Sequence, residues 1–118
     1  MSKVVWIIDP EQWPRALLRA ELLERGYDAV GFLTVDDALR MMPMRWPHLI
    51  VVDLRHLSRQ EAARLFGAEV PVIALTGVAP EPWVSELPFA AVLQRPVSIG
   101  EIADRVEELV NGERSTVP

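Results

Sequence analysis

The chain lacks cysteine and has a single lysine, Lys3. Without cysteine it has neither a disulfide framework nor a thiolate metal site. Long hydrophobic runs are also missing. The apolar run near the N-terminus, residues 4–8, is far shorter than the roughly 20 residues that cross a bilayer, and it is too short for a signal peptide. These absences predict a cytoplasmic protein without a membrane segment.

Positive charge is scarce as well. Seventeen acidic and 12 basic side chains give a net charge of −5. An acidic chain has no electrostatic attraction to nucleic acid or to anionic lipid, so we expect it to bind neither. Half of the 118 residues are hydrophobic, which is enough for the core of one domain. We expect that domain over residues 1–112, followed by a tail or the start of a linker at residues 113–118.

Short apolar runs alternate with amphipathic segments along the chain. The runs lack period-two alternation, which is typical of strands buried on both faces, and they lie at residues 4–8, 29–32, 49–52, 72–75 and 90–93. The expected helices cover residues 11–25, 35–42, 58–66 and 98–112, with at most a two-turn helix within the proline-containing residues 79–88. The alternation predicts a doubly wound α/β fold, in which a five-stranded parallel sheet lies between two helical layers.

Capping residues mark the ends of these helices. Three helices have a polar N-cap followed by an acidic residue three positions later: Thr34 with Asp37, Ser58 with Glu61, and Ser98 with Glu101. Glycine is a common residue just beyond a helix C-terminus. Gly26, Gly67 and Gly112 are the expected stops.

Polar residues follow the expected strands. Functional crevices of such sheets lie beyond the carboxyl ends of the strands, where Asp9, Asp53 and Thr76 fall, with Glu11 and Arg95 close by. Converging carboxylates hold a proton or a hard cation such as Mg²⁺. A hydroxyl and a cationic side chain could neutralise phosphoryl oxygens during a transfer. Asp53 would then be the nucleophile and would form an acyl phosphate.

Each of these residues also has a purely structural interpretation. Asp9 could cap the first helix, with Pro10 in its first turn. Asp53 could begin a loop and accept hydrogen bonds from nearby amides, and Thr76 before Gly77 is ordinary turn chemistry. The residue pattern leaves these alternatives open.

Five short motifs in order resemble one known family, the receiver (CheY-like) domain of two-component response regulators. They are "IID" at the first strand, "ERGY" before the second, "VVDLR" at the third, "ALTG" at the fourth and "QRP" after the fifth. The resemblance covers residues 3–111. It implies a flavodoxin-like fold and a role in phosphorelay signal transduction, with no turnover activity beyond hydrolysis of the domain's own aspartyl phosphate.

The resemblance also implies roles for single residues. Asp53 matches the phospho-acceptor, and Asp9 matches the first member of an acidic pair that holds Mg²⁺. The backbone carbonyl of Arg55 matches a further metal ligand, and Thr76 matches the switch hydroxyl. Arg95 stands where the family has a lysine, before a proline whose preceding peptide is typically cis. The implied partners are a histidine kinase or phosphotransfer protein and an output protein or domain. The sequence identifies neither and leaves homodimerisation open.

Three positions depart from the family pattern. Pro10 replaces the second acidic residue, so that Glu11 is the available substitute as metal ligand. The side chain of Arg95 ends in a planar guanidinium group, whereas the family's lysine ends in a compact ammonium group. Val92 stands at the position of an aromatic switch residue. These changes favour an alternative interpretation, a pseudo-receiver that acts in protein–protein contact or dimerisation without phosphorylation.

A third interpretation is an unrelated α/β domain that binds a nucleotide or flavin, or a small hydrolase. The segment after the first strand, "DPEQWP", contains no glycine, so the phosphate-binding loop of nucleotide-binding folds is missing. The chain also has no serine or cysteine nucleophile elbow. We therefore rank this interpretation last.

Overall fold

A computed structural model describes residues 2–112, so the expected tail at residues 113–118 lies outside the described residues. Five parallel strands form one sheet in the order β2-β1-β3-β4-β5. The strands are β1 (Val4–Ile8), β2 (Asp28–Phe32), β3 (Leu49–Asp53), β4 (Val72–Thr76) and β5 (Ala91–Gln94). All five expected strands are confirmed, and β3 and β4 are buried throughout, as runs without alternation predict.

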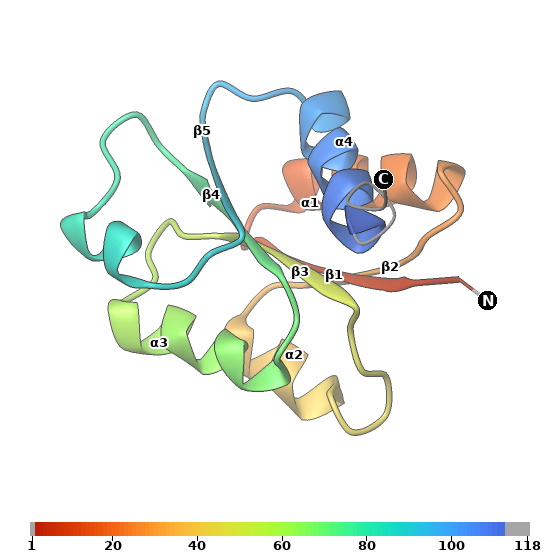
Figure 1. Cartoon of the computed structure of the whole chain (residues 1–118), viewed down its shortest axis with the longest axis horizontal. Coiled ribbons are helices and arrows are strands. Elements are labelled where there is room, and N and C mark those ends of the chain that lie inside the picture. The colour runs from red at the N-terminus through yellow and green to blue at the C-terminus, as the bar shows by residue number, and fades with distance from the viewer. Residues whose placement is uncertain (1, 113–118) are drawn as a thin grey trace.

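Helices cover both faces of the sheet. The α-helices are α1 (Gln12–Glu24), α2 (Val35–Met41), α3 (Arg59–Ala63) and α4 (Ile99–Val110). α1 and α4 lie on one face and α2 and α3 on the other, so the three-layer, doubly wound fold is confirmed (Figure 1). None of the helices among residues 2–112 is long and apolar enough to cross a membrane.

Side chains of each strand divide between two cores. Trp6 and Ile50 point to the layer of α2 and α3, whereas Ile7 and Val51 point to the layer of α1 and α4. Successive strand residues face opposite sides of a sheet, which is why strands covered on both faces are apolar at every position.

The predicted N-caps are confirmed. Capping boxes are complete at Ser58 with Glu61 and at Ser98 with Glu101, and the Thr34 hydroxyl accepts a hydrogen bond from the amide of Asp37. Gly26 follows α1 with φ +92°, a conformation that glycine adopts without strain.

The predicted end of the third helix is wrong. The α-helix stops at Ala63, and a 3₁₀ segment, η1 (Arg64–Ala68), continues through Gly67 to Glu69, which has φ 57°. Leu65 and Ala68 are three residues apart and both buried, and a 3₁₀ turn places that spacing on one face. Both residues of this 3₁₀ segment therefore pack into the core.

The crossover between β4 and β5 is a short 3₁₀ segment, η2 (Pro82–Glu86), and not an α-helix. Flanking prolines remove backbone donors and limit its length, as the sequence indicates. Val84 of η2 is buried against the core. The short helix expected within residues 79–88 is therefore a single 3₁₀ segment.

Candidate functional site

The predicted site residues lie together at the carboxyl edge of the sheet. Asp9 directly follows β1, Asp53 ends β3, Thr76 ends β4 and Arg95 directly follows β5. Strand register keeps them level, because Asp53 pairs with Leu75, the residue before Thr76. The expectation that these side chains share one edge is confirmed.

Two of the carboxylates at this edge are buried. The side chain of Asp9 is 4% exposed and that of Asp53 is 0% exposed. Ionised carboxylates that lose water at this depth need cations or strong donors to compensate. The residues around Asp53 supply both.

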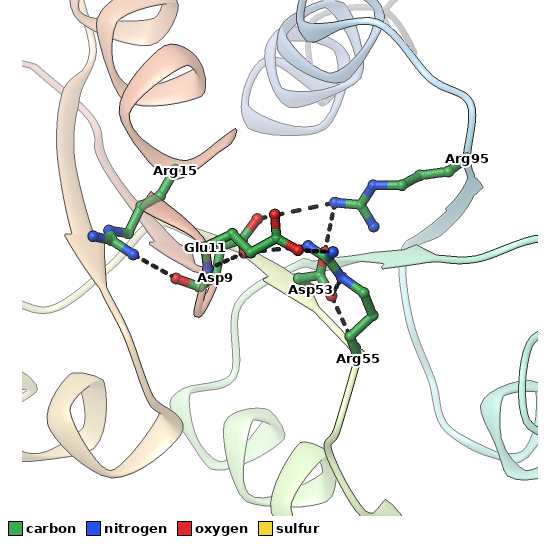
Figure 2. Close-up of polar contacts among 6 residues, drawn as sticks. All are labelled: Asp9, Glu11, Arg15, Asp53, Arg55 and Arg95. Carbon is green, nitrogen blue, oxygen red and sulfur yellow. Dashed lines mark hydrogen bonds and ion pairs between the residues drawn. The ribbon is translucent and has the colours of Figure 1, made fainter. Parts of the chain in front are cut away.

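Arg55 holds Asp53 in a bidentate pair (Figure 2). Its Nε donates to Oδ1 at 2.9 Å and its Nη2 donates to Oδ2 at 2.9 Å. The backbone N–H of Arg55 also donates to Oδ1, at 2.8 Å. Paired guanidinium–carboxylate bonds of this kind are among the strongest hydrogen bonds in proteins.

A tight turn positions this side chain. The amide of Leu57 donates to the carbonyl of Leu54 at 3.1 Å, and His56 within the turn has φ 65°. The turn begins at Leu54, directly after Asp53, so that Arg55 folds back over the end of β3. Arg55 is thereby held above the carboxylate of its own strand.

The same guanidinium reaches the other two acidic residues. Nη2 lies 3.5 Å from Oδ1 of Asp9, and Nη1 is hydrogen-bonded to Oε1 of Glu11. Arg55 therefore contacts Asp9, Glu11 and Asp53 together. We call these three residues the carboxylate cluster.

Arg95 approaches Asp53 from β5. Its Nη2 lies 2.5 Å from Oδ2 of Asp53 and 3.9 Å from Oδ2 of Asp9. The Arg95–Pro96 peptide bond is cis, as the sequence predicts. The three carboxylates of the cluster are thus faced by two guanidinium groups.

Asp9 also bonds to local backbone. Its Oδ1 accepts from the amide of Glu11 at 2.9 Å, and Glu11 is the N-cap of α1. The alternative that Asp9 itself is the N-cap, with Pro10 in the first turn, is wrong, because the helix begins at Gln12 and Pro14 occupies its first turn.

The pKa values of the two buried carboxyls shift in opposite directions. Burial raises the pKa of Asp9, and the neighbouring Asp53 raises it further. Burial also opposes ionisation of Asp53, but hydrogen bonds from Arg55 and the charge of Arg95 outweigh it and lower the pKa of Asp53. The hydrogen bonds to Asp53 raise the pKa of Arg55 in turn. The geometry therefore keeps Asp53 ionised and Arg55 charged.

The carboxylate cluster does not form an open metal site. Among residues 2–112, no group of three histidine, cysteine or acidic side chains is arranged to hold a metal ion. The Arg55 guanidinium lies among the oxygens that would be the ligands (Figure 2). In this arrangement the residues do not fit a Mg²⁺ ion, and the magnesium expected from the sequence stays a prediction.

Two polar groups near Asp53 are buried without a hydrogen-bond partner within the described part of the chain. They are the hydroxyl of Thr76 and Nη1 of Arg95. Unsatisfied buried polar groups are rare in folded proteins, and bound water, a bound ion and a catalytic role are among their explanations. Thr76 also lines a cavity of about 440 Å³ together with Arg55 and Trp83. This edge of the sheet therefore offers unused donors beside a carboxylate.

Sequence reasoning missed the side chain of Arg55 and the role of Arg15. It assigned only the backbone carbonyl of Arg55, whereas the side chain dominates the site. An aspartate at the start of a turn commonly accepts a hydrogen bond from the backbone amide two residues later, so the Asp53–Arg55 spacing was an available signal. Arg15 donates to the backbone carbonyl of Asp9 at 2.8 Å (Figure 2), a contact across a loop that no local pattern predicts.

No protein-family model and no curated protein matches this chain. Solved structures do match. A response regulator receiver domain (CheY-like) from Methanospirillum hungatei JF-1 superposes with a TM-score of 0.85 at 14% identity, covering 99% of this chain and 100% of that chain. The signal receiver domain of a LuxO repressor protein from Vibrio parahaemolyticus gives a TM-score of 0.81 at 16% identity, covering 98% of this chain and 95% of that chain. The fold is that of a receiver domain.

A third match agrees. The receiver domain of a modulated diguanylate cyclase from Desulfovibrio desulfuricans G20 gives a TM-score of 0.80 at 24% identity, covering 99% of this chain and 100% of that chain. The fold implied by the sequence resemblance is confirmed. At these identities the comparison supports the receiver fold and leaves the activity to the site itself.

Two positions that depart from the family pattern, Pro10 and Val92, lie near the candidate site and on β5, respectively. Pro10 lines a second cavity, of about 270 Å³, together with Asp53 and Arg55. Val92 lies on β5 opposite Ala74 and is exposed to solvent. Neither position adds a side chain that bonds to the carboxylate cluster.

Proposed function

We propose that this chain is a receiver domain in two-component signalling and that Asp53 accepts a phosphoryl group. The proposed donor is a histidine kinase or phosphotransfer protein, and the phosphorylated domain then changes its contacts with an output protein or domain. The observation that carries the proposal is the pair of unused buried donors at the strand ends, the Thr76 hydroxyl and Nη1 of Arg95.

These donors match the chemistry of the transfer. A phosphoryl group on Asp53 would bring three acceptor oxygens to the edge that holds a hydroxyl and a guanidinium. Arg95 already lies 2.5 Å from Oδ2 of Asp53, so that its charge would act on the developing phosphoryl negative charge. A bound phosphoryl oxygen could satisfy each orphaned donor.

The proposed step is a nucleophilic displacement at phosphorus. A carboxylate oxygen of Asp53 forms the new bond to phosphorus while the bond to the donor's histidine nitrogen breaks, and that nitrogen keeps the electron pair. The product is an acyl phosphate. Its hydrolysis by water returns the carboxylate and releases inorganic phosphate, and we propose no turnover on any other substrate.

One observation favours a second candidate function. Both oxygens of Asp53 are already engaged by Arg55 and Arg95, and the side chain is closed off from solvent. A pseudo-receiver, which contacts its partner without phosphorylation, fits an acceptor carboxylate held in this way. The two candidates differ in whether Asp53 reacts.

Intact-mass measurement after incubation with a small phosphodonor, acetyl phosphate, tests the choice. We expect the protein to gain the mass of one phosphoryl group and Asp53→Asn to gain none. Asp104→Asn, at an exposed acidic residue of α4, is the matched control and should react like the original protein. A folded protein that gains no mass, with Asp53 intact, would overturn phospho-acceptance and support the pseudo-receiver.

A further inference from the structure

The Arg55 guanidinium stands where a metal ion would have to stand. One planar group contacts carboxylate oxygens of Asp9, Glu11 and Asp53, and it approaches both oxygens of Asp53. A divalent cation shared by these three residues would lie among the same oxygens. The side chain and the ion therefore compete for one position.

We propose that the Arg55 guanidinium is the built-in cation of this site, which replaces a divalent metal ion and excludes Mg²⁺ from the carboxylate cluster. The inference rests on the proposed receiver site, but it does not depend on whether Asp53 is phosphorylated. It assigns to one side chain a function that the sequence pattern assigned to a cofactor.

The charge balance supports this assignment. The cluster carries three negative charges, and Arg55 and Arg95 supply two positive charges. A further divalent ion would make the site positive while two guanidinium groups are already close by, and like charges at this distance repel. Without Arg55, three carboxylates would face Arg95 alone, and the site would attract a hard cation.

Access to Asp53 supports it as well. Oδ1 of Asp53 accepts two hydrogen bonds from Arg55, Oδ2 accepts one from Arg55 and is ion-paired with Arg95, and the Asp53 side chain is 0% exposed. The Arg55 side chain is 33% exposed and lines two cavities at this edge. An ion or a phosphodonor would reach Asp53 only after Arg55 moves toward solvent. Arg55 therefore shields Asp53 from solvent and also balances its negative charge.

A single substitution tests the role of the Arg55 guanidinium. Arg55→Gln removes the guanidinium but retains the backbone carbonyl at position 55 and the three carboxylates. The matched control is Arg25→Gln, because Arg25 also bridges three carboxylates, Glu21, Asp104 and Glu107, away from the site. Isothermal titration with MgCl₂ and thermal unfolding at increasing Mg²⁺, at constant ionic strength, measure binding independently of any phosphoryl transfer.

We expect the original protein and Arg25→Gln to bind Mg²⁺ weakly and with the same affinity. Arg55→Gln should bind Mg²⁺ about ten-fold or more tightly than the original protein, and its melting temperature should rise by about 5 °C at saturating ion. Adding Asp53→Asn to Arg55→Gln should abolish the gain, which would place the ion at the cluster.

Equal Mg²⁺ affinity in the original protein and Arg55→Gln, or no binding by either, would overturn the inference. If Arg55→Gln does not fold, Arg55→Lys, which keeps one charge but loses the planar fork, should give a smaller gain of the same sign. Failure of the proposed function is a separate result, because it is the absence of a phosphoryl mass gain on Asp53 and leaves the Mg²⁺ titration unaffected.

Discussion

Two arginines in this molecule each bridge three carboxylates, in contrasting surroundings. Arg25 ties α1 to α4 through Glu21, Asp104 and Glu107, whose side chains are 34%, 67% and 44% exposed. We call these three residues the surface cluster. Arg55 bridges the carboxylate cluster, in which Asp9 and Asp53 are nearly or completely buried.

The contrast predicts that burial of the partners, and not the number of ion pairs, sets how much an arginine contributes to stability. Carboxylates of the surface cluster can turn to water when Arg25 is lost, and exposed ion pairs contribute little to stability. The Asp53 carboxylate cannot turn to water in this way, because its side chain is fully buried. A buried charge that loses its partner is strongly destabilising.

The largest expected difference concerns stability after each arginine is replaced. Arg55→Gln should lower the free energy of unfolding by about 3 kcal/mol, because Asp53 keeps its burial and loses its bidentate partner. Arg25→Gln should have a clearly smaller effect in the same urea titration. Equal losses would show that burial of the carboxylates does not separate the two clusters.

A smaller effect concerns the pH dependence within the carboxylate cluster. Asp53→Asn should cost about 1–3 kcal/mol at neutral pH, since charged hydrogen bonds are lost. The pKa of Asp53 is lowered on folding, so its contribution is present above its ordinary value and disappears as the pH falls through the lower folded value. The deficit of the variant should therefore shrink below about pH 4.

Asp9→Asn is the control with the opposite sign. The pKa of Asp9 is raised on folding, so ionised Asp9 costs stability as the pH rises through its folded value. The asparagine variant avoids this cost, and its stability relative to the original protein should improve as the pH rises from about 4. Urea titrations of both variants between about pH 3 and pH 7 test the signs. A change in the same direction for both would contradict the charge arrangement described.

The smallest expected effect concerns two threonines. The Thr76 hydroxyl is buried without a partner among the described residues, so Thr76→Val should raise the free energy of unfolding by about 1 kcal/mol. Thr34→Val is the matched control and should lower it by about 1 kcal/mol, because Thr34 caps α2. Thermal or urea unfolding measures both. A loss of stability in Thr76→Val would show that the hydroxyl has a partner in solution, and would weaken its assignment as an unused donor.

Most of the fold could be predicted from local patterns. Apolar runs without alternation located all five strands, and capping pairs located the starts of α2, α3 and α4. The errors fell where packing decides between similar local structures. After Ala63 the chain continues as a 3₁₀ segment, whose Leu65 and Ala68 both reach the core.

The sequence predicted which residues form the candidate site, but it did not predict how their side chains contact one another. Strand ends of a parallel sheet meet at one edge, so the sequence by itself placed Asp9, Asp53, Thr76 and Arg95 together. The sequence also set which of these groups can ionise, whereas the tertiary surroundings set the direction of the pKa shifts of Asp9 and Asp53.

Which cation balances the carboxylates was decided only by the tertiary structure. Arg55 lies 44 residues from Glu11 and 46 residues from Asp9, and their contact depends on the pairing of β1 with β3 and on the turn after Asp53. Periodicity and capping report on neighbours within a few residues of each other. Ion pairing depends on distance in space, so the choice between a metal ion and a guanidinium appears only once the strands are side by side.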